Sequence, residues 1–257
     1  VHKCVENSSG LTLAAKIIKA RSQKEKVMNQ LNHANLIQLY AAFESRNDII
    51  LVMEYVEGGE LFDRIIDENY NLTELDTVLF IRQICEGLQY MHKMYILHLD
   101  LKPENILCSP HLSCTGLFEY FLAPEVINYE FVSFPTDMWS LGVITYILSG
   151  LSPFLGDDDN ETLNNILACE WNFEEEEFKD VSDEAKDFIT RLLVKSKSWR
   201  MSATESLKHP WLSDRSLHYQ LNRKVNTKFT LQQNLLYSKQ TSKTNENSLA
   251  HSPASSQ

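Results

Sequence analysis

Hydrophobic and polar residues alternate along the first part of the chain with the two-residue period of β-strands. Residues 1–19 read VHKCVE, a polar turn at NSSG and then LTLAAKIIK, which predicts a β-hairpin. Two more strand-like runs follow, NLIQLYAAF at 35–43 and DIILVMEYV at 48–56, and a short helix is expected at 22–31. The pattern therefore predicts a small, β-rich unit at the start of the chain.

From about residue 57 the apolar positions take on the period of α-helices. In TELDTVLFIRQICEGLQYMHKM apolar residues recur about every 3.6 positions, and Thr73 is placed to cap the N-terminus of this helix. Further helices are predicted in DMWSLGVITYIL, ETLNNILACE, DEAKDFITRLLV and ATESLKHPWL. The expected fold class is α+β, with a small lobe at 1–56 and a larger helical lobe at 57–212.

Composition and charge exclude several classes of function. The 257 residues include 24 Lys+Arg and 35 Asp+Glu, a net charge of -11, which argues against nucleic-acid binding because that needs a basic surface. The longest apolar stretch, LGVITYILSG, is interrupted by polar residues and too short to cross a bilayer, so no membrane partner is expected. Five scattered cysteines without a CxxC motif predict reduced thiols in a cytoplasmic protein.

The composition changes after Leu212. Residues 213–257 form a tail with six Lys/Arg and two acidic residues, a local charge of +4 that leaves -15 for the rest of the chain. The last part of this tail is rich in Ser, Asn, Thr and Gln and is expected to be disordered. Earlier in the tail, four apolar residues recur at every fourth position between basic side chains: Leu217, Leu221, Val225 and Phe229. This spacing allows a basic amphipathic helix of the kind that calmodulin binds, and the alternative is a solvated or disordered tail.

Two acidic runs, DDD at 157–159 and EEEE at 174–177, raise the question of calcium binding. Neither has the ligand spacing and central glycine of an EF-hand loop. We interpret both as solvated surfaces near a basic substrate.

The motif HLDLKPEN carries the strongest chemical signal. Asp100, Lys102 and Asn105 are spaced so that they can converge on one phosphate-transfer site. An aspartate can accept or orient a hydroxyl proton, a lysine can offset developing negative charge, and an asparagine can ligate a metal. The motifs APE and DMW follow in order. Lys16, in AAKII, is a weaker signal, because a lysine on a strand is usually a solvated charge.

Together these motifs resemble those of protein kinases. HLDLKPENILC, FVSFPTDMWSLGV and SGLSPFLGDDDNETLNNIL resemble the myosin light chain kinase family of the calcium/calmodulin-dependent group, and the resemblance covers about residues 1–212. It implies a bilobal protein-kinase fold and transfer of the ATP γ-phosphate to Ser or Thr of myosin regulatory light chain or a similar protein. The implied cofactors are ATP and Mg²⁺. It also implies that the segment at 213–240 is autoinhibitory and binds calmodulin.

The resemblance implies a role for each residue of the site. In the catalytic loop, Asp100 is the expected base, Lys102 a phosphate contact and Asn105 a magnesium ligand. The other expected positions surround ATP: Lys16 at the α- and β-phosphates, Met53 at the back of the adenine pocket, Glu54 and Val56 with backbone hydrogen bonds to adenine, and Glu60 at the ribose or a basic substrate side chain.

Four further positions have implied structural or regulatory meaning. Glu125 is expected to pair with Arg200, and Asp137 to brace the backbone of the catalytic loop; we interpret these as architecture. Leu99 stands where many kinases have an arginine that pairs with a phosphorylated loop. Because leucine cannot make a charge-assisted hydrogen bond, control by a tail segment is the expected alternative.

The chain departs from the family pattern at two places in its N-terminal lobe and in one helix of the larger lobe. Val1 corresponds to the valine just after the Gly-rich loop, so that loop is expected to be missing or truncated. The stretch between Lys16 and MNQLNH is short, and Glu25 stands three residues before Met28 instead of four, a rotation of about 100° on a helix. ITYILSG is one residue short, which is expected to disturb the end of a buried helix.

The largest departure lies between Asn105 and Ala123. Seventeen residues, 106–122, stand where the family has roughly forty, including the metal-binding Asp of DFG and the activation segment. They include SPHLSCTGLFEY, with Phe118 where a substrate-positioning threonine is expected. We therefore predict a kinase-like chain with impaired catalysis and a marginal fold. The alternative is a non-catalytic, pseudokinase-like interaction module or a truncated splice product.

Overall fold

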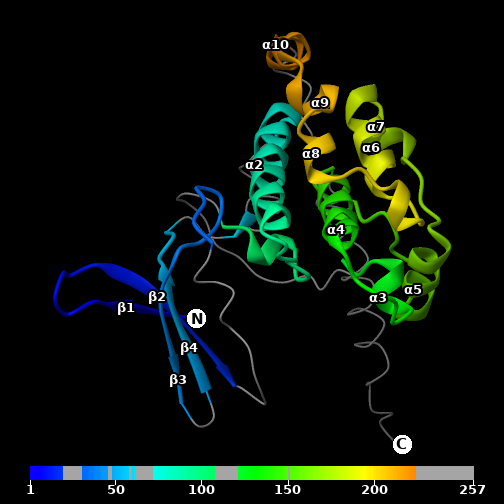
Figure 1. Ribbon diagram of the computed structural model, residues 1–257. Helices are drawn as coiled ribbons and strands as arrows, with labels where there is room; N and C mark the ends of the chain where they lie inside the picture. The colour runs from blue at the N-terminus through cyan, green and yellow to red at the C-terminus, as the bar shows by residue number, and fades with distance from the viewer. Residues whose placement is uncertain are drawn as a thin grey trace, which may run out of the picture.

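The computed structural model describes most of the chain in two parts, a sheet and a group of helices (Figure 1). The described residues are 1–19, 31–45, 48–57, 60–61, 72–107, 121–149 and 151–223. Most of the predicted helix at 22–31, including Glu25 and Met28, lies outside them, and so does Phe118. The predicted α+β, two-part architecture is confirmed. Among the helices that are described, none is long and apolar enough to span a membrane.

The N-terminal part is one antiparallel sheet with the strand order β1-β2-β4-β3. Its strands are β1 (His2–Val5), β2 (Thr12–Lys19), β3 (Leu39–Glu44) and β4 (Asp48–Glu54). The predicted hairpin is confirmed, and its turn ends at Gly10, whose φ of 73° suits a residue without a side chain. The third strand begins later than predicted, because a turn closed by Leu36 N–H on the carbonyl of His33, at 3.0 Å, precedes it.

The C-terminal part is helical. Its α-helices are α2 (Glu74–Lys93), α3 (Pro124–Ile127), α4 (Phe134–Ile147), α5 (Asp159–Ala168), α6 (Glu175–Phe178), α7 (Asp183–Leu192), α8 (Ala203–Ser206), α9 (Pro210–Ser213) and α10 (Arg215–Arg223). The predicted cap of α2 is confirmed: Thr73 Oγ1 accepts from Asp76 N–H at 3.1 Å, and Asp76 Oδ2 accepts from Thr73 N–H at 3.0 Å.

The segment ATESLKHPWL was predicted as one helix and forms two. Helix α8 ends at Ser206, and α9 starts at Pro210 with His209 as its N-cap. Proline lacks the N–H that a continuing helix needs, but it suits the first turn of a new one. His209 Nδ1 accepts the N–H of Trp211 at 3.3 Å, which caps the second helix.

Helix α4 forms the centre of the hydrophobic core. Every residue from Thr136 to Ile147 is buried, and Leu148 is fully buried just beyond it. Gly142 allows a close approach of α7, since a Cβ there would lie 2.8 Å from that of Leu192. Leu148 N–H still donates to the carbonyl of Ile144 at 3.1 Å. The disturbance expected from the short ITYILSG segment is therefore not seen up to this point of the helix.

Candidate catalytic loop and nucleotide site

The loop after α2 brings together the two predicted catalytic residues, Asp100 and Lys102, and the predicted metal ligand, Asn105. It enters a 3-10 turn at Pro103–Asn105, where the fixed φ of proline favours the first position. The turn places Asn105 over Asp100: Asn105 Nδ2 donates to the backbone carbonyl of Asp100 at 2.7 Å and to its Oδ2 at 2.8 Å. Lys102 Nζ lies 3.6 Å from Asp100 Oδ1. The Asp100 side chain remains 69% exposed, so it is accessible to a substrate.

Asp137, on the buried face of α4, holds this loop in shape. Its Oδ1 accepts from Leu99 N–H at 2.8 Å, and its Oδ2 accepts from His98 N–H at 3.0 Å. The same Oδ2 lies 2.8 Å from His92 Nε2. Leu99 has a φ of 59°, a conformation that residues other than glycine rarely adopt. The two charge-assisted bonds stabilise this unusual backbone, as expected for Asp137.

The Glu125–Arg200 pair is present and buried. Arg200 Nη1 and Nη2 donate to the two carboxylate oxygens of Glu125 at 2.6 and 2.8 Å, and Thr136 Oγ1 donates to Oε1 at 2.9 Å. Burial by itself raises the pKa of Glu125, but the hydrogen bonds from Arg200 outweigh burial, so that the pKa lies below its usual value. The pair fixes α3, which carries the APE motif, to the segment after α7.

Two groups of the catalytic loop have no hydrogen-bond partner. His98 Nδ1 and Glu104 Oε2 are among the few buried side-chain atoms without one in the described part of the chain. Such atoms are rare in folded proteins. Burial lowers the pKa of His98, although the carboxylates of Asp137 and Asp100 oppose this effect. Sequence reasoning did not single out either group, because their isolation is visible only in three dimensions.

Lys16 and Met53 lie on the same face of the sheet. Met53 is paired with Ala14 and Lys16 with Leu51, and residues that are paired or two apart in a strand share a face. Lys16 is exposed, and within the described ranges no carboxylate lies within 4.0 Å of its ammonium group. The expected glutamate partner is thus absent from the residues that the structure describes.

The remaining predicted nucleotide contacts lie at the end of β4 and just after it. Glu54 N–H donates to the carbonyl of Gln38 at 2.9 Å, so its N–H is already used and only its carbonyl can serve adenine. Val56 follows outside the strand. Glu60 forms an isolated bridge with Leu107, two residues after Asn105. The structure therefore brings Glu60 next to the catalytic loop.

The residues present do not fit the magnesium site of a complete kinase. In protein kinases the metal ions are held by the catalytic-loop asparagine together with the DFG aspartate. Here the amide nitrogen of Asn105 is bound to Asp100, which leaves its oxygen for a cation. In the described part of the chain no group of three or more His, Cys, Asp or Glu could hold a metal ion. Between Asn105 and Ala123 the sequence offers a single acid, Glu119.

Comparison with known proteins agrees with this geometry. The protein kinase domain family matches residues 1–117 and 112–212, and the chain belongs to the protein kinase family. The chain is 65% identical to human myosin light chain kinase family member 4 over 252 residues, covering 86% of this chain and 65% of that protein. It is 59% identical to human myosin light chain kinase 3, covering 83% of this chain and 30% of that protein. The chain therefore spans less than two thirds of the length of these relatives.

Solved structures resemble the fold as a whole. A twitchin kinase fragment from C. elegans superposes with a TM-score of 0.78 at 33% identity, covering 98% of this chain and 61% of that chain. The autoinhibited serine kinase domain of titin superposes with a TM-score of 0.74 at 33% identity, covering 90% of this chain and 85% of that chain. The predicted kinase-like, bilobal fold is confirmed.

The extent of the match also measures what this chain lacks. The alignment with the human family member 4 is 252 residues long, but it includes only 86% of this chain, or about 221 of its 257 residues. About thirty positions within the matched region therefore have no counterpart here. The kinase family matches the chain in two segments that overlap at 112–117, which is consistent with a shortened connection at that place.

Proposed function

We propose that this chain is a serine/threonine kinase-type protein of the myosin light chain kinase group whose phosphate transfer is strongly impaired. Its substrate is a myosin regulatory light chain or a similar protein. The observation that carries the proposal is the seventeen-residue connection between Asn105 and Ala123, with one acid and no DFG. Its residues 1–56 are a partial small lobe, 57–212 a large lobe without the activation segment and 213–257 a tail, in a cytoplasmic protein.

Membership of the protein kinase family supports the chemistry that we assign to each residue. Asp100 orients the substrate hydroxyl and takes its proton, and Lys102, 3.6 Å away, offsets charge on the transferred phosphate. Lys16 holds the ATP phosphates, and Met53, the Glu54 carbonyl and Val56 surround adenine. Glu60 contacts the ribose or a basic side chain. In complete kinases Mg²⁺ neutralises the phosphates. The loss of one such electrostatic element costs on the order of 3–4 kcal/mol, or 10²–10³ in rate.

A phosphate-transfer assay tests this proposal. The full chain and human myosin light chain kinase family member 4 are supplied with radiolabelled ATP, Mg²⁺ and a basic, serine-containing light-chain peptide. We expect kcat/KM for this chain to be lower by about a hundredfold or more. Asp100→Asn gives the background without the base. Transfer within about tenfold of the human enzyme overturns the proposal.

A second candidate function is a non-catalytic interaction module. Contacts within the large lobe favour it. The Glu125–Arg200 pair and the hydrogen bonds to Asp137 are made between residues of the chain and need no bound nucleotide. A thermal-shift measurement with Mg-ATP separates the two candidates, because a ligand that binds the native state raises Tm. A shift supports the impaired kinase, and no shift supports the interaction module.

Calmodulin binding at 213–240 is the partner hypothesis that follows from the tail. Helix α10 covers part of this segment, but Leu217 is 9% exposed and Leu221 packs against the core. Val225 and Phe229 lie outside the described residues. Calmodulin must therefore displace α10 to grip the full apolar stripe. A calcium-dependent gel shift of the full chain with calmodulin tests this, and no shift at micromolar protein ends the hypothesis.

A further inference from the structure

Three aromatic side chains lie almost fully exposed on the helical part of the chain. Tyr129 and Phe131, in the loop between α3 and α4, are 98% and 93% exposed. Trp199, in the 3-10 turn Lys197–Trp199, is 80% exposed. In the part of the chain that the structure describes, none of them packs against another aromatic ring. All three rings are therefore open to a contact from outside, which is unusual for side chains of this size.

Hydrogen bonds join the two segments that carry these side chains. Lys197 Nζ donates to the carbonyl of Phe131 at 2.8 Å. Arg200, directly after Trp199, donates from Nη1 to the carbonyl of Pro135 at 3.1 Å, and a buried ion pair holds its guanidinium in place. The loop after α3 and the turn that contains Trp199 therefore form one continuous surface. We call it the aromatic surface and define it by Tyr129, Phe131 and Trp199.

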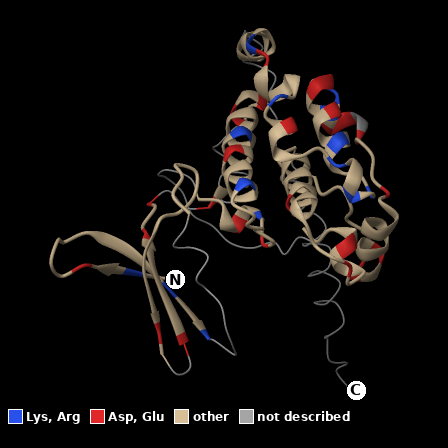
Figure 2. Cartoon of the chain, in the orientation of Figure 1, with Lys and Arg blue, Asp and Glu red and all other residues tan. Residues whose placement is uncertain are grey.

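The aromatic surface carries charges of both signs at its edges. Glu130 belongs to the loop after α3, and Lys195 precedes the turn that contains Trp199; both side chains are exposed. Among the described residues neither of the two has an ion-pair partner. Figure 2 shows acidic and basic residues in this part of the helical lobe. A surface with an apolar centre, an acid on one segment and a base on the other is complementary to a second copy of itself.

The size of the aromatic surface suits a contact between proteins. A buried aromatic side chain contributes about 150–250 Å², so these three offer about 500 Å². A standard interface buries about 800 Å² per partner. Val132, 39% exposed in the same loop, adds to the apolar area. Aromatic residues are also enriched among the side chains that contribute most to binding. Three side chains thus supply more than half of the area that a stable dimer needs.

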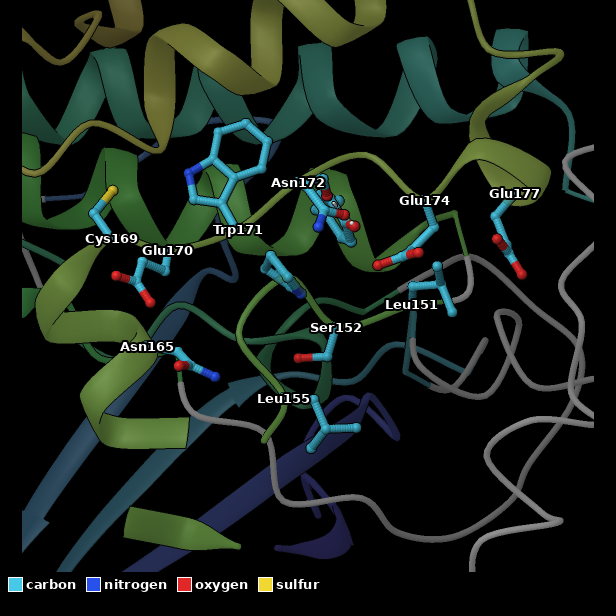
Figure 3. A pocket seen from close by; sticks show the side chains of 12 residues that line it. Leu151, Ser152, Leu155, Asn165, Cys169, Glu170, Trp171, Asn172, Glu174 and Glu177 are labelled. Atoms are coloured by element: carbon cyan, nitrogen blue, oxygen red, sulfur yellow. Dashed lines mark hydrogen bonds between the residues drawn. The ribbon is translucent and has the colours of Figure 1, made fainter. Parts of the chain in front are cut away.

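The cavity beside Trp171 offers no comparable surface (Figure 3). Its volume is about 790 Å³, and the carboxylates in its lining do not point toward one position. The most exposed large apolar side chain in the lining is Leu155, at 49%. The aromatic surface is therefore the stronger candidate for a contact with another molecule.

We propose that the aromatic surface binds a second copy of this chain in a two-fold symmetric dimer. The symmetry places the loop after α3 of one copy against the turn of Trp199 of the other copy, and this contact occurs twice. Glu130 of each copy then faces Lys195 of the other, beside the packed aromatic side chains. No residue of the catalytic loop or of the proposed nucleotide site takes part, so the test of the dimer is independent of the proposed function.

Sedimentation velocity of the full chain at a series of concentrations tests the proposal. We expect a monomer–dimer equilibrium with a Kd on the order of 10 μM. Trp199→Ser is expected to weaken association about tenfold or more, because it removes a large apolar contact. The matched control is Tyr219→Ser, which removes a side chain that is 65% exposed on α10, at the opposite end of the helical part (Figure 1). The control is expected to change Kd by less than about twofold, since it lies outside the interface.

Reversal of the edge charges tests how the two copies face each other. Glu130→Lys and Lys195→Glu each place like charges opposite one another in their own dimers, so each alone is expected to weaken association about tenfold or more. In an equimolar mixture of the two variants, opposite charges face one another again at both contacts. The mixture is therefore expected to associate with a Kd within about threefold of that of the native chain. Circular dichroism checks that every variant is folded.

Three results would overturn the proposal. The first is a native chain that stays monomeric up to about 200 μM. The second is equal association of Trp199→Ser and Tyr219→Ser. The third is a mixture of the two charge variants that associates no better than either variant alone.

Discussion

At the scale of single residues, the Glu125–Arg200 pair differs from the exposed ion pairs described in this chain by its burial. Both side chains are almost fully buried, at 3% and 0% exposed, and two hydrogen bonds join them. Removal of one partner leaves a buried charge without compensation. We predict that Glu125→Gln lowers the free energy of unfolding by about 3 kcal/mol or more, measured by urea denaturation.

The control is the same substitution in an exposed pair. Glu86 Oε1 lies 3.2 Å from Nε of Arg82, which is one turn earlier on α2, and both side chains are exposed. Exposed pairs of this kind contribute little, so Glu86→Gln is expected to cost less than about 0.5 kcal/mol. Equal costs for the two substitutions would contradict the importance of burial.

The same carboxylate gives a pH dependence. The pKa of Glu125 in the folded chain lies below its ordinary value of 4.5, so its contribution is fully present above pH 4.5 and is lost as pH falls through the folded pKa. The Tm difference between the native chain and Glu125→Gln is therefore expected to shrink below pH 4.5. A thermal melt series from neutral to acidic pH measures it, and a constant difference argues against the ion pair as its source.

At the scale of elements, the catalytic loop depends on α4. Asp137 receives the N–H groups of His98 and Leu99, and no other acceptor for them is found in the described residues. We predict that Asp137→Ala lowers the free energy of unfolding by about 2–4 kcal/mol and accelerates hydrogen exchange at these two amides. Asp180→Asn, at an exposed position, is the control. Unchanged protection of the two amides would show that the loop holds its shape without α4.

Element boundaries were predictable where the signal is local. Thr73 and Asp76 form a capping box within four residues, so the start of α2 follows from the sequence. Helix α4 begins at Phe134, earlier than predicted, because Ser133 and Thr136 form a further capping box there. The break before Pro210 was present in the sequence but was outweighed by helical periodicity. The sequence pattern thus predicted which segments form helices better than it predicted the residues at which those helices begin and end.

Part of the candidate site was predictable, because its residues are close together in the sequence. Asp100, Lys102 and Asn105 lie within six residues, so their convergence follows from one turn of chain. The isolation of His98 Nδ1 depends on which distant groups fail to reach it. That isolation has no signature in local sequence.

At the scale of the whole molecule, an apolar stripe crosses one face of the sheet. Ile50 of β4 is paired with Ile17 of β2 on one side and with Phe43 of β3 on the other, so the three side chains share a face. Ile17 and Phe43 are 52% and 58% exposed. Adjacent exposed apolar groups of this kind favour association between molecules. The stripe agrees with the expected marginal fold.

We predict that Phe43→Thr raises the temperature at which the chain begins to aggregate, as measured by light scattering, while unfolding free energy changes by less than about 1 kcal/mol. Leu79→Gln is the control, because Leu79 is similarly exposed, at 53%, but lies on helix α2. An equal gain from both substitutions would show that exposure alone, and not the stripe, causes the aggregation.

We propose that the chain retains the catalytic loop of a kinase but lacks the residues that hold magnesium beside it. The test is the affinity for ATP with and without Mg²⁺, measured by isothermal titration calorimetry on the full chain and, in parallel, on human myosin light chain kinase family member 4. We predict that ATP binds and that Mg²⁺ changes the ATP affinity of this chain by less than about threefold. A tightening of about tenfold or more by Mg²⁺ would contradict the account, because it would require a metal site that Asn105 and its neighbours complete without a DFG aspartate.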